Sequence, residues 1–246
     1  MKCLAVIPAH GGSKRIPRKN ILEFCGKPVI GWSIEAAIAS GLFSRIVVST
    51  DDPDIADVAR QFGAEVPFMR PRVLSDDYTP TVPVIGHAID ELGGGQVLAQ
   101  TCCIYATASF VRSQDLVRCH ALRTESGADY AMPVTSFAFP IQRGVTVGND
   151  GRLTMLYPDL VSTRSQDLPP VFHDAGQFYF GQSDAWLCGR PVIGQGAAAH
   201  VIPRYRVQDI DTPEDWMRTE LMFTASRQSD SNGEENSISC RPENLS

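Results

Sequence analysis

The sequence CLAVIPAHGGSKRIPRKN, at residues 3–20, joins a short apolar run to a basic loop that contains two glycines. Residues 3–7 have the length and composition of a buried strand. Residues 29–40 follow the loop and place Ile30 and Ile34 on one face of a helix. A strand, a loop and a helix in this order form the repeating unit of folds with a parallel sheet. We therefore expect an α/β fold that begins with this unit.

The alternation of strand-like and helix-like segments continues through the first half of the chain. Further strands are expected at residues 46–49 and 101–105, and further helices at residues 53–62, 84–92 and 113–122. Strands separated by helices of this length form a parallel sheet with right-handed crossovers. The sequence thus predicts a single α/β domain with a mainly parallel sheet, and ligands are expected beyond the carboxyl ends of its strands.

The second half of the chain departs from this alternation. Residues 145–147 and 152–156 flank the sequence GNDG at residues 148–151, which is a hairpin signal. Residues 163–174 are polar and contain proline, as is typical of a long surface loop. We expect an inserted hairpin region at about residues 140–175.

The end of the chain reads as one more strand, one more helix and a tail. A strand is expected at residues 200–203, and Thr212 followed by Pro213 supplies a cap and a first-turn proline for the last helix. The sequence after this helix is rich in Ser, Asn and Glu, which is typical of disorder. We expect a folded domain over residues 1–223 and a disordered tail over residues 224–246.

The composition is that of an ordinary globular protein. Of the 246 residues, 43% are hydrophobic and 20% are charged, which allows a sizeable core and excludes global disorder. The net charge of −6 disfavours nucleic acid as a partner. Seven cysteines without a C-x-x-C pair argue against zinc and disulfides. No signal peptide and no apolar run of ~18 residues is recognisable, so we expect a cytoplasmic protein with no membrane partner.

The loop at residues 8–20 has the strongest chemical signal in the chain. It holds four Lys and Arg side chains and no acidic residue. Glycines let backbone N–H groups approach an anion closely, while Lys14 and Lys19 supply positive charge and Ser13 a hydroxyl donor, a combination suited to phosphate. The residue order fits neither the P-loop nor the dinucleotide-binding glycine motif. The alternative is a solvated basic surface loop.

Several further motifs follow this loop in a fixed order. They are Gly26-Lys27-Pro28, Arg70-Pro71 with Leu74-Ser75-Asp76-Asp77, Arg164-Ser165-Gln166-Asp167-Leu168 and Asp209-Ile210-Asp211-Thr212. Together with the loop, they resemble the CMP-sugar-acid synthetases, the cytidylyltransferases that charge sialic acid, 3-deoxy-manno-octulosonate and pseudaminic acid with CMP. The resemblance covers about residues 3–223. Residues 102–107, 172–176 and 207–212 are most similar to the branch that uses pseudaminic acid.

The resemblance implies a Rossmann-like nucleotide-diphospho-sugar transferase fold and a site for CTP. It implies that the basic loop holds the triphosphate, mainly through Ser13, Lys14 and Lys19. It also implies that Asn20, Arg70 and Thr81 surround the cytidine. The expected nucleotide-binding residues are Pro8, Ala9, His10, Gly11, Gly12, Ser13, Lys14, Lys19, Asn20, Arg70, Thr81 and Tyr105.

Two acidic residues near the last helix are the candidate metal ligands. Asp209 and Asp211 lie two apart in a segment that reads as extended, so both carboxylates face one side and can bind one hard cation. We expect Mg²⁺ there, together with the triphosphate. The alternative is that they cap the last helix, although Thr212 is the better cap. A D-x-D pair also occurs in metal-dependent glycosyltransferases, a rival class that the basic loop disfavours.

The reaction that the resemblance implies is transfer of CMP from CTP to a nonulosonic acid, with release of pyrophosphate. Pseudaminic acid is the expected acceptor, and N-acetylneuraminic or legionaminic acid is the alternative. Lys14, Lys19 and Asp211 are the expected catalytic residues. The expected sugar-acid residues are Arg164, Gln166, His173 and Ala175, with Arg164 and a protonated His173 facing the sugar carboxylate.

Two further expectations depend on the resemblance. His10 stands where the related loops carry an arginine, which leaves a nucleotide-binding module without catalytic activity as an alternative from another class. A homodimer is also implied, with the inserted region as its contact.

Overall fold

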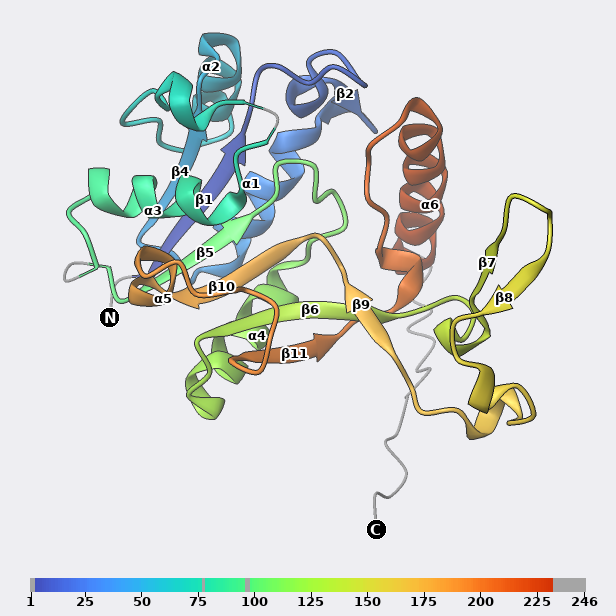
Figure 1. Cartoon of the computed structure of the whole chain (residues 1–246). Helices are drawn as coiled ribbons and strands as arrows, with labels where there is room; N and C mark the ends of the chain where they lie inside the picture. The colour runs from blue at the N-terminus through green and yellow to red at the C-terminus, as the bar shows by residue number, and fades with distance from the viewer. Residues whose placement is uncertain (1–2, 77, 96–97, 232–246) are drawn as a thin grey trace.

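The computed structural model describes residues 3–76, 78–95 and 98–231, and one mixed sheet runs through the middle of the molecule (Figure 1). Its strand order is β11-β6-β10-β5-β1-β4, and β9 also pairs with β6. The strands are β1 (Cys3–Ala9), β4 (Arg45–Thr50), β5 (Gln100–Ile104), β6 (Tyr130–Ser136), β9 (Phe172–Asp174), β10 (Phe178–Gln182) and β11 (Ala197–Val201).

Most strands of the sheet run in one direction, which confirms the predicted mainly parallel sheet. The pairs β1–β4, β1–β5 and β6–β11 are parallel. Strand β10 is antiparallel to β5 and β6, and β9 is antiparallel to β6. Both reversed strands come after the inserted region, and no α-helix lies between β6 and β9, a stretch that the structure describes in full, to restore the parallel direction.

Helices cover both faces of the sheet. One face packs against α1 (Val29–Ser40), α2 (Pro53–Gln61) and α4 (Ser113–Ser126), and the other against α3 (Thr81–Glu91) and α5 (Ser183–Leu187). Strand β1 shows why both faces need cover. Ala5 and Ile7 point into the first layer and Leu4 and Val6 into the second, and all four are completely buried.

The inserted region forms an arm that projects away from the sheet (Figure 1). The predicted hairpin is confirmed as β7 (Val145–Val147) and β8 (Leu153–Met155), and the arm also contains η3 (Ile141–Arg143), η4 (Pro158–Leu160) and η5 (Ser165–Asp167). The expected loop at residues 163–174 is partly wrong, because its end is strand β9, which hydrogen-bonds to β6.

Helix α6 (Pro213–Ser231) stands beside the short strands β2 (Glu23–Phe24) and β3 (Lys27–Pro28) (Figure 1). The Phe223 ring packs edge-on against Trp32, at 4.6 Å between centroids, and against Phe24, at 5.3 Å. These contacts attach the helix to the domain.

The predicted tail boundary is wrong, because α6 continues to Ser231. The Arg227 guanidinium lies 5.2 Å from the centre of the Trp32 ring and 5.8 Å from that of Phe223. This cation–π contact holds the polar end of the helix against the domain. Residues 232–246 of the predicted tail lie outside the described residues.

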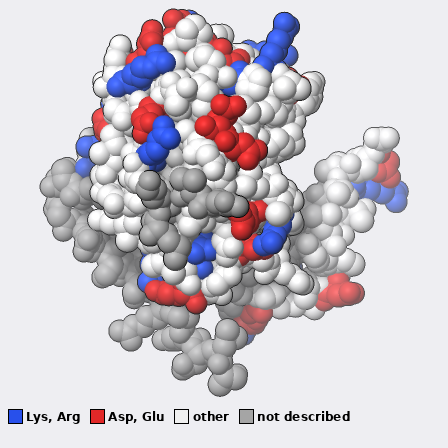
Figure 2. All heavy atoms as spheres, turned by 90° about the vertical axis from the view of Figure 1, so that its left-hand side faces the viewer, with Lys and Arg blue, Asp and Glu red and all other residues white. Residues whose placement is uncertain are grey.

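The surface carries charges of both signs. Figure 2 shows acidic and basic side chains interspersed on the face turned to the viewer, without one broad basic field there. Of the helices in the part of the chain that the structure describes, none is long and apolar enough to cross a membrane.

We expect removal of residues 224–246 to destabilise the protein more than removal of residues 232–246. The longer truncation deletes Arg227 and its contact with two aromatic rings, which contributes about 0.5–1 kcal/mol. Thermal unfolding should show a Tm lower by about 1–4 °C for the longer truncation. Equal Tm values for the two truncated proteins would contradict this attachment.

Candidate functional site

The loops after β1 and β4 and the segment after α2 meet at one edge of the sheet. Parallel pairing places Ala9 at the end of β1 beside Thr50 at the end of β4. Arg70 is brought to the same edge, because its backbone N–H donates to the Thr50 carbonyl at 2.8 Å. The residues after β1 and β4 therefore lie together, where the fold was expected to bind its ligand.

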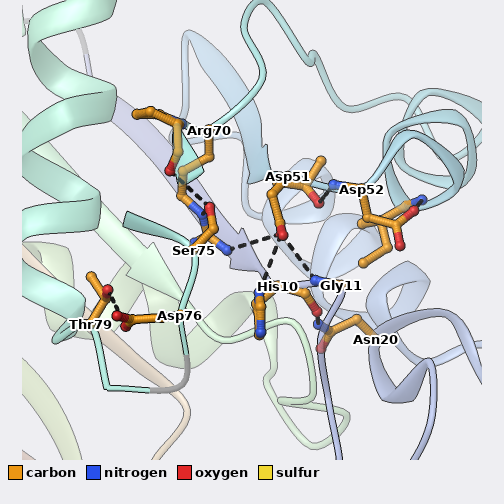
Figure 3. Close-up of polar contacts among 12 residues, drawn as sticks. His10, Gly11, Asn20, Asp51, Asp52, Arg70, Ser75, Asp76 and Thr79 are labelled. Carbon is orange, nitrogen blue, oxygen red and sulfur yellow. Dashed lines mark hydrogen bonds and ion pairs between the residues drawn. The ribbon is translucent and has the colours of Figure 1, made fainter. Parts of the chain in front are cut away.

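The Asp51 carboxylate, which follows β4, is the centre of this edge (Figure 3). Its Oδ1 accepts the Gly11 N–H at 3.0 Å and lies 3.4 Å from His10 Nδ1 and 3.5 Å from Arg70 Nη2. Arg70 is only 6% exposed, and its Nε also donates to the Ser75 hydroxyl at 3.2 Å. One carboxylate thus joins the basic loop to a buried guanidinium.

The charges at this centre shift the titration of both partners. Burial acts to raise the pKa of Asp51, but the Gly11 N–H and the charges of His10 and Arg70 outweigh it, so the pKa lies below the ordinary 3.8. Burial lowers the pKa of Arg70, and Asp51 opposes that shift. Because a guanidinium stays charged in proteins, the pair is an ion pair at neutral pH.

The site's own side chains lie close to the two glycines of the loop. A Cβ on Gly11 would lie 2.7 Å from Asp52 Oδ2, and a Cβ on Gly12 would lie 2.5 Å from His10 Nε2. The sequence-based reason was close approach of backbone N–H groups to an anion. In this structure the Gly11 N–H donates to an anionic group of the protein itself, the Asp51 carboxylate.

The far end of the basic loop contacts the predicted metal-binding segment. Lys19 Nζ donates to the Ile210 carbonyl at 2.5 Å and lies 3.7 Å from Asp211 Oδ1. Arg15 Nη2 lies 3.0 Å from the same carboxylate oxygen. Asn20 is buried, and its amide donates to the His10 carbonyl at 2.8 Å, so it braces the loop. The loop and Asp211 therefore form one charged surface, next to which Lys14 is exposed.

Asp209 and Asp211 do not cap α6, so that alternative is wrong. Thr212 caps the helix, because the backbone N–H of Asp215 donates to Thr212 Oγ1 at 3.2 Å. The Asp215 carboxylate in turn accepts hydrogen bonds from the backbone N–H groups of Thr212 and Asp211. Within residues 3–76, 78–95 and 98–231, no group of three or more His, Cys, Asp and Glu could hold a metal. Magnesium usually binds one or two carboxylates and completes its shell with phosphate and water, so the Asp209 and Asp211 carboxylates suit a metal that arrives with a triphosphate.

A pocket of about 150 Å³ opens beside the Asp51 centre. This volume is smaller than the ~300–1,000 Å³ of a drug-sized site, so it suits one ring of a ligand. Its lining residues are Pro8, His10, Arg70, Leu74, Asp76, Thr79, Thr81, Val84 and Tyr105. The sequence-predicted residues Pro8, His10, Arg70, Thr81 and Tyr105 are thus brought together.

Sequence reasoning missed several residues of this site. Asp51 received no role as a site residue, although an acid at the carboxyl end of a parallel strand is itself a signal. Asp76 and Thr79 line the pocket, and Asp76 Oδ1 accepts the Thr79 hydroxyl at 2.6 Å (Figure 3). Asp76 was noted within a motif without a role at the pocket.

The predicted sugar-acid residues lie on different segments. Arg164 and Gln166 belong to the arm, where Arg164 Nε donates to Asp167 at 2.7 Å. His173 lies on β9, and its Nδ1 is 2.8 Å from the Asp174 carbonyl. Ala175 is only 3% exposed, so its methyl group lies in the core at the end of β9.

The chain is similar to several known proteins in sequence and in fold. The family described as cytidylyltransferase matches residues 4–136. The chain is 40% identical to a pseudaminic acid cytidylyltransferase of Campylobacter jejuni, over 93% of this chain and 99% of the relative. It is 29% identical to a CMP-N,N′-diacetyllegionaminic acid synthase of Legionella pneumophila, over 91% and 97%. A solved structure of CMP:2-keto-3-deoxy-manno-octonic acid synthetase complexed with CTP is similar in fold, with a TM-score of 0.67, 17% identity, and coverage of 92% and 100%.

The Asp51→Asn variant should be less stable than the parent at neutral pH. The amide cannot pair with Arg70 as a charge, and a buried partner left without its ion pair costs about 1–3 kcal/mol. Because the folded-state pKa of Asp51 is lowered, its stabilisation is present above pH 3.8 and is lost as pH falls through the lowered value.

Urea unfolding as a function of pH checks this prediction. The difference in free energy of unfolding between parent and variant should be constant near neutral pH and should disappear in the acid range below pH 3.8. Asp57→Asn, at a carboxylate that is 71% exposed and paired with Arg60, is the matched control and should show almost no gap. A gap that is independent of pH would contradict the ionic role of Asp51.

Proposed function

The chain belongs to the cytidylyltransferase family, and we propose that it transfers CMP from CTP to a nonulosonic acid, with pseudaminic acid as its preferred acceptor. It is a nucleotidyltransferase enzyme, so the glycosyltransferase and non-catalytic alternatives are set aside. The acceptor is proposed from the similarity to the Campylobacter jejuni relative, which extends along nearly the whole of both chains.

The observation that carries the proposal is the pocket beside Asp51 and its continuity with the basic loop. Arg70, Thr81 and Tyr105 line a space for one ring, which we assign to the cytosine base. From there, residues 10–19 lead to Lys19, which lies 3.7 Å from Asp211. A base in the pocket would therefore direct its triphosphate along the loop, where Ser13, Lys14 and Lys19 bind the phosphates.

In the proposed reaction, the anomeric hydroxyl of the sugar acid attacks the α-phosphorus in line. The bond from the α-phosphorus to the bridging oxygen breaks, pyrophosphate leaves with that electron pair, and the hydroxyl proton is lost. The chain contributes by positioning the two reactants and by stabilising negative charge through Lys14 and Lys19.

We propose Mg²⁺ as the metal, held by Asp209 and Asp211. When bound, the ion neutralises charge on the triphosphate. Asp211 is 41% exposed and already lies within reach of Arg15 and Lys19, the cations of the loop. These contacts hold the Asp211 carboxylate at the edge where the outer phosphates are expected.

A homodimer formed through the arm is also proposed. Val147 and Leu153 on the β7–β8 hairpin are each 67% exposed, and Val161 is 57% exposed. Apolar side chains gathered on a projecting arm suit a contact with a second copy. Arg164 and Gln166 lie on this arm, so their proposed role in binding the sugar acid depends on how two copies pack.

We also propose a cytoplasmic location for the protein, because CTP is supplied there.

Competition between acceptors tests the proposed function. The purified protein is incubated with CTP, Mg²⁺ and equal amounts of pseudaminic and N-acetylneuraminic acid, and the CMP products are measured by mass spectrometry. We expect pseudaminic acid to be preferred in kcat/KM, with a modest difference of about 10²-fold, because apolar pockets reject an extra hydroxyl weakly. Equal or reversed preference would move the acceptor to the neuraminic acid class.

Asp211→Asn should weaken metal binding at the CTP complex. Titration of the CTP-bound protein with Mn²⁺, followed by electron paramagnetic resonance, should show at least tenfold weaker binding, and turnover should fall with it. Asp57→Asn, on the exposed surface of α2, is the control. Unchanged Mn²⁺ affinity together with full activity would remove Asp211 from the metal site.

A further inference from the structure

The segment that carries the candidate metal ligands follows a buried arginine. Arg206 is the last residue of η6 (Arg204–Arg206), and its side chain is only 7% exposed. Its guanidinium pairs with the carboxylate of Asp115 on α4, which is 10% exposed, and Nη2 lies 3.4 Å from the Phe110 carbonyl oxygen. We call residues 207–211, which come directly after Arg206, the metal segment.

Asp115 uses both of its carboxylate oxygens. Oδ2 accepts a hydrogen bond from Arg206, and Oδ1 lies 3.1 Å from Nε2 of His200 on β11. Burial acts to raise the pKa of Asp115, but the hydrogen bonds and charges of His200 and Arg206 outweigh it, so the pKa lies below the ordinary 3.8. Because a buried guanidinium needs an opposite charge beside it, Asp115 determines where the Arg206 side chain lies.

The backbone of Arg206 is held by a second buried residue. Its carbonyl accepts the side-chain amide of Gln177, which is 4% exposed, at 2.6 Å. The Gln177 carbonyl accepts the backbone N–H of Tyr105, a residue of the pocket lining, at 2.9 Å. Arg206 is therefore joined to α4 and also to the residues beside the pocket, which fixes the start of the metal segment relative to the pocket.

The other end of the metal segment meets the basic loop. Ile210 is 1% exposed, and its carbonyl accepts the Lys19 ammonium at 2.5 Å. The same ammonium lies 3.7 Å from Asp211 Oδ1. Because residues 207–211 form neither a helix nor a strand, the contacts at their two ends decide where they lie. A shift of Arg206 would therefore displace the Ile210 carbonyl, and with it the ammonium that this carbonyl holds.

We propose that Asp115, acting through Arg206, positions the metal segment for the outer phosphates of CTP and for the metal that accompanies them. The inference rests on the proposed function, which puts the triphosphate at Lys19 and a divalent cation at Asp209 and Asp211. Asp115 and Arg206 are positioning residues, because both are buried and neither lines the pocket or belongs to the basic loop. Residues that hold metal ligands in place commonly affect metal affinity as strongly as this role requires.

Asp115→Asn tests the proposal because an amide cannot supply the charge beside Arg206. We expect the buried guanidinium to turn toward water and to release the start of the metal segment. The CTP-bound variant should bind Mn²⁺ roughly tenfold more weakly, the lower end of the effect of such partners at metal sites.

A second readout needs no metal. CMP lacks the outer phosphates, so its dissociation constant should not change in Asp115→Asn. CTP should bind more weakly, because Lys19 loses the carbonyl that holds it. The preference for CTP over CMP should therefore fall by about two- to tenfold, the scale of one hydrogen bond.

Mn²⁺ binding to the CTP complex is followed by electron paramagnetic resonance, and CTP and CMP binding by calorimetry without metal. Thr101→Val is the matched control, because Thr101 is buried and its hydroxyl bonds that of Ser183 at 2.9 Å, away from the metal segment. It should lower the Tm and keep the parent's Mn²⁺ affinity and nucleotide preference. Arg206→Lys keeps a charge beside Asp115 without the planar guanidinium, so it should lose less Mn²⁺ affinity than Asp115→Asn.

The outcomes separate positioning from stability. If Asp115→Asn lowers the Tm as Thr101→Val does but keeps the parent's Mn²⁺ affinity and its preference for CTP over CMP, the inference is overturned. If Asp115→Asn fails to fold by circular dichroism, Arg206→Lys decides, and parent values for that variant would overturn the inference. Absence of turnover by the parent with CTP and every acceptor would contradict the proposed function, while the preference for CTP over CMP would still test the positioning.

Discussion

One oxygen of the Asp51 carboxylate lies within reach of three groups, which come from two separate parts of the chain. The Gly11 N–H belongs to the loop after β1, and the Arg70 guanidinium belongs to the segment after α2. Parallel pairing of β1 with β4 is what brings these segments together. Arg70 can stay buried only because a charge faces it, and removing that charge would leave a desolvated cation. The pocket, the start of the basic loop and the wall at Arg70 all depend on this carboxylate.

A second buried ion pair holds the other side of the site. Arg206, on η6 (Arg204–Arg206), pairs with Asp115 of α4, and its carbonyl accepts the amide of Gln177 at 2.6 Å. The next residues lead to Ile210, which is buried and bonded by Lys19. The segment that carries Asp209 and Asp211 has no sheet partners of its own, so these anchors place it. Both ends of the basic loop are therefore fixed by contacts to distant residues, as pre-organised binding of a polyanion requires.

The sequence predicted those parts of the fold that depend only on residues close together in the chain. The alternation of strand and helix, the hairpin and the Thr212 cap each follow from spacing within one short segment. The reversal of β10 could not be predicted in this way, since a strand's direction depends on its partners. The end of α6 was missed for a similar reason, because its polar residues hold their place through Arg227 and the distant Trp32.

The site shows the same division. Pro8, His10, Arg70, Thr81 and Tyr105 were found through motif order, and the pocket joins them. The Asp51 centre links residues some forty and nineteen positions apart, and the Tyr105 ring packs against that of Tyr179 because β5 and β10 are neighbours. Such contacts carry no local pattern. The roles of Arg164, Gln166, His173 and Ala175 stay predictions.

A crystal structure of the protein with CTP and Mg²⁺ tests the central claim most directly. We expect the cytosine ring to lie between Arg70 and Tyr105, with the triphosphate along residues 10–19 toward Asp211 and with the Gly11–Asp51 contact retained. A base bound outside the pocket lined by Arg70, Thr81 and Tyr105, or a loop that releases Asp51 to bind phosphate through Gly11, would contradict it.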